Sequence, residues 1–173
     1  MNVTFHIVGS IATAAVLSLS PTEKWHSASA LKKYAIGFAV GILIHGVLDF
    51  LPHSYPLPSK IDVIFALLVL ILSLFLAQNQ NKLLVLFCFS GAIFPDVVDL
   101  GAGIANKHLG IPLPQLNFKI SPWHWKEYSG SIYDGSRFFE STVYHILLLL
   151  ICFSLIYAYR NDFLDFKSLE IVE

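Results

Sequence analysis

Long apolar segments alternate with short polar stretches along this chain. A helix that crosses a bilayer needs roughly 17–25 mostly apolar residues, and five segments approach that length. Their ends carry turn-forming residues such as Ser20-Pro21 and Leu51-Pro52. The pattern predicts five membrane-spanning helices, at residues 3–19, 34–51, 61–77, 83–100 and 138–159.

One long connection interrupts this alternation. Gly101-Ala-Gly103 is expected to end the fourth segment, and residues 101–136 that follow are rich in Pro, Gly and aromatic residues. A connection of this length is usually functional or disordered. Its Trp123, Trp125 and Tyr128 carry amphipathic rings, which are enriched where a membrane meets water. We therefore expect an interfacial lid, within one integral membrane domain at residues 1–173.

The composition supports an all-α polytopic membrane bundle. The chain is 55% hydrophobic and 13% charged, with a mean hydropathy of +0.66, whereas soluble domains carry about 25% charged residues. A net charge of −1 gives no reason to expect a nucleic-acid partner. Cys88 and Cys152 lie inside apolar runs and are expected to be buried apolar residues, with no disulfide framework.

The unusual ionisable residues all fall on one side of the predicted membrane. Starts of odd-numbered segments and ends of even-numbered segments share one face, whereas random interfacial polar residues would divide between both faces. Ionisable groups inside spans are costly, and are therefore usually functional or paired. The residues on this face are His6, His45, Asp49, His53, Asp96, Asp99, His124 and His145.

Spacing brings several of these residues together. His45 and Asp49 are four apart, so they neighbour each other on a helix. Gly37 and Gly41 continue the same stripe and would let another helix approach closely. A cluster of His and Asp without Cys suits zinc or a similar divalent ion. The sequence predicts a site for two or three such ions.

Three motifs resemble known metal-dependent proteins. Phe38-Ala-Val-Gly-Ile-Leu-Ile-His45-Gly-Val-Leu-Asp49-Phe-Leu-Pro-His53 resembles a ligand-bearing helix of zinc-dependent phospholipase C-like proteins. Gly91-Ala-Ile-Phe-Pro-Asp96 resembles their G-A-x-x-P-D segment, although it precedes the helix there and follows it here. His6-Ile-Val-Gly9 resembles the start of small membrane-bound metal-dependent hydrolases. The resemblance implies metal ligands at His6, His45, Asp49, Asp96 and His145, and further candidates at His53, Asp99 and His124.

These patterns predict a membrane-embedded hydrolase that cleaves a phosphoester of a lipid or lipid-linked substrate. Asp49 and Asp96 are the expected catalytic carboxylates, with Glu140 as a candidate general base. A metal-ion or proton transporter could use the same cluster, but it needs polar residues continuing to the far face. A structural membrane protein with a static polar network is the third alternative, and metal content would separate it from the other two.

Basic residues favour one orientation. The short connections and the tail on the face opposite the cluster carry six Lys and Arg residues. By the positive-inside rule, this places the cluster outside the cytoplasm. We expect a bacterial inner (plasma) membrane protein whose partners are membrane lipid and a phosphoester substrate. Substrate identity and oligomeric state stay open at this point.

Overall fold

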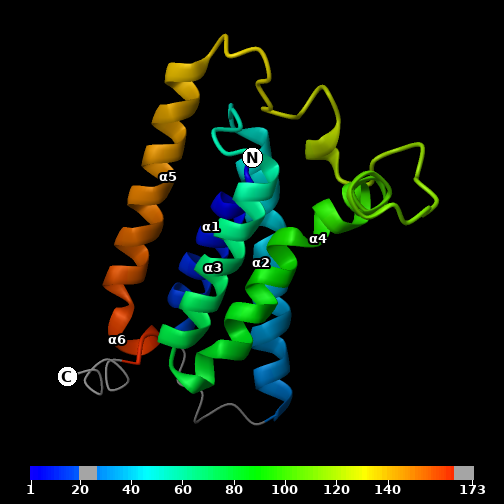
Figure 1. The fold of residues 1–173 in the computed structure, drawn as a ribbon. Helices are drawn as coiled ribbons and strands as arrows, with labels where there is room; N and C mark the ends of the chain where they lie inside the picture. The colour runs from blue at the N-terminus through cyan, green and yellow to red at the C-terminus, as the bar shows by residue number, and fades with distance from the viewer. Residues whose placement is uncertain (20–26, 166–173) are drawn as a thin grey trace.

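The computed structural model describes residues 1–19 and 27–165, which form a helical bundle without strands (Figure 1). Consecutive long helices alternate in direction. Within these residues, four helices are long and apolar enough to cross a membrane, and one apolar helix is shorter. The predicted all-α membrane bundle is confirmed. The elements are α1 (Val3–Ser18), α2 (Ser27–Phe50), α3 (Ser59–Leu76), α4 (Asn79–Leu109), η2 (Pro122–His124), α5 (Phe138–Ala158) and α6 (Arg160–Phe163).

The short helix α1 lies inside the bundle and packs against α2, α3, α4 and α5. Twelve of its 16 residues are buried. At about 1.5 Å per residue it is about 24 Å long, shorter than the ~30 Å hydrocarbon core. Asp62 of α3 caps it, because its carboxylate accepts the backbone N–H groups of Val3 at 2.7 Å and Thr4 at 3.0 Å. An internal helix therefore carries its own polar residues without meeting lipid.

Glycines bring α2 and α4 into close contact. A Cβ atom at Gly41 would lie 2.4 Å from the Cys88 carbonyl oxygen, and one at Gly91 would lie 2.0 Å from the Phe38 carbonyl oxygen. No larger residue fits either position without moving a backbone. At Gly37 the nearest atom would be the Cys88 sulfur, at 2.9 Å. The close contact predicted for the Gly37/Gly41 stripe is confirmed.

Two helices extend beyond their predicted bounds. Helix α2 begins at Ser27 rather than residue 34, because polar helix-forming residues continue it past the apolar run. The prediction that α4 ends at Gly101–Gly103 is wrong, since it continues to Leu109. Glycine in a helix costs only about 1 kcal/mol relative to alanine, which tertiary contacts can override. The helix ends at Gly110, which has φ +67° and donates its N–H to Ala105 O.

Apolar residues separate the two ends of the bundle and cover its outside. The large side chains of Phe65 and Leu72 on α3, and of Leu150 and Phe153 on α5, are exposed and would face lipid. Both cysteines are buried, as expected from the sequence. The interior layer below the polar end consists of Ile7, Ile11, Ala14, Ala15, Leu84, Val85 and Cys88.

Candidate metal centre

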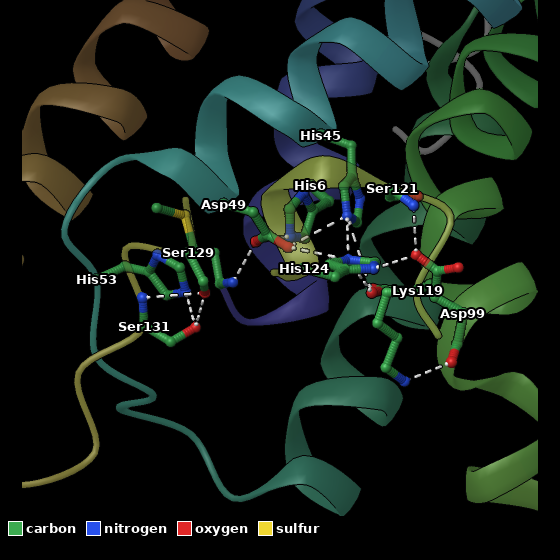
Figure 2. Close-up of polar contacts among 12 residues, drawn as sticks. His6, His45, Asp49, His53, Asp99, Lys119, Ser121, His124, Ser129 and Ser131 are labelled. Atoms are coloured by element: carbon green, nitrogen blue, oxygen red, sulfur yellow. Dashed lines mark hydrogen bonds and ion pairs between the residues drawn. The ribbon is translucent and has the colours of Figure 1, made fainter. Parts of the chain in front are cut away.

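Four ionisable side chains from three separate segments meet at one end of the bundle. His45 and Asp49 come from α2, Asp96 comes from α4, and His124 comes from η2. One ligand atom from each lies within 4.8 Å of the others, so the group could hold a metal ion. Figure 2 shows His45, Asp49 and His124 pointing toward one another. We call these four residues the metal centre.

The spacing of the four atoms is close to that of a tetrahedral coordination shell. His45 Nε2 lies 3.2 Å from Asp49 Oδ2, 3.3 Å from His124 Nε2 and 3.8 Å from Asp96 Oδ1. His124 Nε2 lies 3.4 Å from Asp49 Oδ2 and 3.3 Å from Asp96 Oδ1. Four ligands at about 2.0–2.2 Å from one zinc ion would be about 3.3–3.6 Å apart. Four of the five distances lie within about 0.1 Å of this range and the fifth exceeds it by about 0.2 Å, so the four atoms are close enough together for a single ion to contact them all.

Both histidines are oriented by a partner on their other ring nitrogen. His45 Nδ1 donates to the Ala92 carbonyl oxygen at 2.6 Å, and His124 Nδ1 donates to Asp99 Oδ2 at 2.8 Å. Metal-bound histidines commonly donate this N–H to a carbonyl or carboxylate. The arrangement turns both Nε2 atoms inward, where two facing lone pairs need a cation between them.

A proton competes with a metal ion for the space between the Nε2 atoms of His45 and His124. Burial lowers the pKa of His124, but hydrogen bonds to Asp49, Asp96 and Asp99 outweigh it and raise the pKa to about 10. Without an ion, a proton on His124 neutralises part of the carboxylate charge. The electrostatics of the centre therefore demand positive charge, which either a proton or a divalent ion can supply.

Asp99 positions the segment that carries His124. Its carboxylate accepts the backbone N–H groups of Ile120 at 2.8 Å and Ser121 at 2.9 Å, besides the ring N–H of His124. With both oxygens used, Asp99 is a supporting residue, whereas the sequence made it a candidate ligand. The ring of Trp123 packs on Gly46, where an added Cβ would lie 2.7 Å from the ring.

His6 lies beside the centre and contacts the second oxygen of Asp49. Its Nε2 is 3.2 Å from Asp49 Oδ1, and its ring stacks on His45 with centroids 4.1 Å apart. Both ring nitrogens are buried and form no hydrogen bond. The amino group of Met1 also contacts Asp49 Oδ1. Asp49 thus faces the metal centre with one oxygen and His6 with the other (Figure 2).

His53, a candidate ligand from the sequence, belongs to a different polar network. His53 is fully buried, and its Nδ1 donates to Leu51 O at 2.7 Å. Its Nε2 lies 3.2 Å from the Tyr55 hydroxyl and 3.2 Å from the Ser131 hydroxyl, and Figure 2 shows the second contact. His53 is therefore held by neutral partners instead of joining the metal centre. It anchors the connection, because its backbone N–H donates to Gly130 O at 2.9 Å.

The structure also leaves His145 and Glu140 outside the metal centre. The ring of His145 stacks on Phe5 with centroids 4.3 Å apart, and its Nδ1 faces the Ser141 hydroxyl at 3.5 Å. Glu140 accepts a hydrogen bond from Arg137 Nε at 2.6 Å at the exposed start of α5. Helical position predicts the face on which a residue lies, but not the neighbour that will occupy that face.

Three supporting contacts were missed by sequence reasoning, namely Asp62 capping α1, Ala92 O accepting from His45, and Trp123 packing on Gly46. Only the last had a sequence signal. A glycine inside an apolar helix costs stability and often marks a close contact. The other two depend on helix packing.

Comparisons with protein-family models, curated proteins and solved structures found no match.

Proposed function

We propose that this protein is a membrane-embedded, divalent-metal-dependent hydrolase that cleaves a phosphoester of a lipid or lipid-linked substrate. The observation that carries the proposal is the metal centre, whose four ligand atoms lie within 4.8 Å of one another and come from three segments. Nitrogen and oxygen ligands without sulfur favour zinc. The position at one end of a bundle of apolar helices favours a substrate that lies in the membrane interface.

Catalysis requires more than the metal centre alone. Four protein ligands complete a tetrahedral shell, whereas catalytic zinc sites keep a position open. His6 and Asp49 Oδ1 offer part of a second site, in which Asp49 would bridge two ions as carboxylates do in two-metal hydrolases. The two buried ring nitrogens of His6 without hydrogen bonds support this assignment. Bound divalent ions would neutralise a phosphate and lower the pKa of a bound water to about 7.

The exposure of the ligands indicates how substrate reaches the centre. The side chain of Asp96 is 24% exposed, against 10% for Asp49 and 0% for His45. The centre is thus most open beside Asp96. Asp96 Oδ1 belongs to the group of ligand atoms, which leaves Oδ2 to accept a proton from an attacking water. Asp49 faces His6 with Oδ1, and its Oδ2 lies 3.2 Å from His45 Nε2 and 3.4 Å from His124 Nε2.

The interior below the centre supports hydrolysis rather than transport. The hydroxyls of Ser10, Thr13 and Ser73 donate to carbonyl oxygens of their own helices, at 2.7–2.9 Å. They therefore form no chain of hydrogen bonds away from the centre. The layer around Ile11 and Leu84 is apolar. A transporter would need a polar path through this layer.

Orientation is part of the proposal, and it places the metal centre outside the cytoplasm. The opposite end of the bundle carries the basic residues Lys32, Lys82 and Arg160. Reporter tags after Pro56 and after Gly110 should lie in one compartment, and a tag near Gln80 in the other. Tags after Pro56 and Gly110 that report different compartments would contradict the bundle topology. A cytoplasmic result for both would reverse only the orientation.

Hydrolysis is tested on purified protein in detergent. Protein prepared without chelator should release phosphate or a phosphorylated headgroup from phosphatidic acid or phosphatidylcholine. Removal of metal should abolish release, and added zinc should restore it. The variant Asp96→Asn should lose activity, while Glu140→Gln should retain it. Metal-replete protein that cleaves no phosphomonoester or phosphodiester lipid would overturn the proposed activity.

A further inference from the structure

A hollow lined by cationic and apolar side chains lies beside the metal centre. The last turns of α4 and residues 114–119 enclose a cavity of about 350 Å³, within the ~300–1,000 Å³ range of ligand pockets. Asp99, in its wall, follows Asp96 by one helical turn. Figure 1 shows this part of α4 and the following connection projecting from the side of the bundle. We call residues 101–120 the arm, and this hollow the arm pocket.

The accessible charges in the arm pocket are positive. Lys107, His108 and Lys119 line it, and Asp99 is the only acidic residue in its lining. The Asp99 side chain is fully buried, and backbone N–H groups and His124 use its carboxylate oxygens. Lys119 Nζ donates to the backbone carbonyl of Asp99 at 2.7 Å, which does not neutralise its charge. A ligand that enters the pocket therefore meets cations.

Lys107 is available to a ligand. It is exposed, and within the described parts of the chain it forms no ion pair or side-chain hydrogen bond. A cation in the last turn of a helix also complements the helix dipole. Lys119 has no such role, because it reaches the pocket from another segment. Convergence of cations from two segments on one hollow indicates an anion-binding site.

Apolar side chains complete the arm pocket and its surroundings. Val98, Ile104 and Leu116 line it beside the cations. Leu109 and Phe118 on the arm are 70% and 65% exposed. Exposing these apolar side chains to water would be costly. At the level of the lipid headgroups, the acyl chains of the membrane would cover them instead. The arm therefore presents an anion-binding hollow next to an apolar surface.

We propose that the arm pocket binds the phosphate-bearing headgroup of an anionic membrane phospholipid, whose acyl chains lie against the apolar surface of the arm. Cations in the hollow recognise the phosphate, and the exposed apolar residues recognise the chains. This goes beyond the proposed hydrolysis, because binding at Lys107 does not need the metal centre. Should both hold, the pocket would deliver an anionic lipid to Asp96.

Native mass spectrometry of the purified full chain in detergent tests the proposal, with phosphatidic acid, phosphatidylcholine and inorganic phosphate as separate probes. Wild-type protein should retain phosphatidic acid in preference to phosphatidylcholine. Each interfacial cation contributes roughly a fivefold increase in affinity for anionic lipid, so Lys107→Gln should weaken retention about fivefold. Lys60→Gln is the matched control, because Lys60 is an exposed cation at the start of α3 outside the pocket.

A pair of glycine variants tests the cavity itself. Gly103 lines the arm pocket, and Gly103→Leu should fill it and lower phosphatidic acid retention. Gly101→Leu should not, because Gly101 lies outside the lining and a Cβ there meets only Val97, at 3.9 Å. Retention unaffected by both Lys107→Gln and Gly103→Leu would overturn the site. Inorganic phosphate that competes with phosphatidic acid at equal concentration would show a soluble-anion site and overturn the lipid assignment.

Discussion

Two histidines, His124 on the connection and His53 packed against it, have opposite electrostatic environments. His124 lies among Asp49, Asp96 and Asp99, which raise its pKa to about 10. Burial lowers the pKa of His53 to about 4, and its ring faces the neutral hydroxyls of Tyr55 and Ser131. Burial alone therefore does not make a histidine a metal ligand. The neighbouring carboxylates create the demand for positive charge, and only the region around His124 has them.

The largest expected effect is the loss of zinc affinity when two residues of the metal centre are removed. A protein with His45→Ala and Asp49→Ala should bind zinc more than about a hundredfold more weakly, since loss of an outer-shell partner alone costs 10–100-fold. His53→Ala is the control and should keep its zinc, because His53 lies outside the metal centre. Competition with a chromophoric chelator measures both affinities. Equal losses of zinc affinity in the two variants would contradict the difference between the regions around His124 and His53.

The next largest effect should come from a substitution at the glycine contact between α2 and α4. Gly41→Ala places a Cβ atom against Cys88 O and should destabilise the fold by about 3 kcal/mol, at the upper end of overpacking costs. It should also weaken zinc binding, because His45 donates to Ala92 across this contact. At Gly101 an added Cβ atom would meet only Val97 at 3.9 Å, an ordinary van der Waals contact, so Gly101→Ala should be neutral or stabilising by up to about 1 kcal/mol. Thermal unfolding in detergent compares them.

Asp99→Asn tests the support of His124 without removing a ligand. The amide keeps the size of the side chain but loses the charge that faces the ring N–H. Zinc affinity should fall about 10–100-fold, as is typical for such partners, with little change in helical content by circular dichroism. Zinc affinity equal to that of the wild type would show that Asp99 only caps the connection and does not tune His124.

The smallest expected effect is the loss of folding stability in acid that results from the low pKa of His53. The pKa of His53 is about 4 in the fold against 6.5 for an ordinary histidine, so the unfolded chain binds more protons between these values. Stability should thus rise with pH in that window, and about 2 kcal/mol should be lost between pH 7 and pH 5. The slope of the unfolding free energy against pH should be shallower in His53→Gln. Parallel slopes would contradict the neutral state of His53.

The members of the metal centre that local patterns could predict were those that share a helix. His45 and Asp49 are four residues apart, and Gly41 on the same stripe indicated the approach of a second helix. The sequence could not distinguish His124, which belongs to the metal centre, from Asp99, which supports it. Their roles depend on where the connection folds back, which backbone N–H groups and the contact of Trp123 with Gly46 determine.

The helical period also could not predict which neighbour meets each face. His145 lies toward the same end of the bundle as the metal centre, but Phe5 of α1 occupies the position against its ring. The end of α4 was misplaced for a similar reason, because Gly101 and Gly103 weaken a helix without ending it. Residues far apart in sequence decide both outcomes, so periodicity and turn signals were insufficient.

X-ray absorption spectroscopy of the zinc-loaded protein tests the central claim most directly. The metal centre predicts two imidazole nitrogens and carboxylate oxygens at about 2.0–2.2 Å from the first zinc ion, and no sulfur at about 2.3 Å. His124→Ala should lose imidazole scattering or lose the ion, whereas His145→Ala should leave the spectrum unchanged. A sulfur shell, a spectrum without imidazole scattering, or a spectrum that changes with His145 and not with His124 would contradict the metal centre described by His45, Asp49, Asp96 and His124.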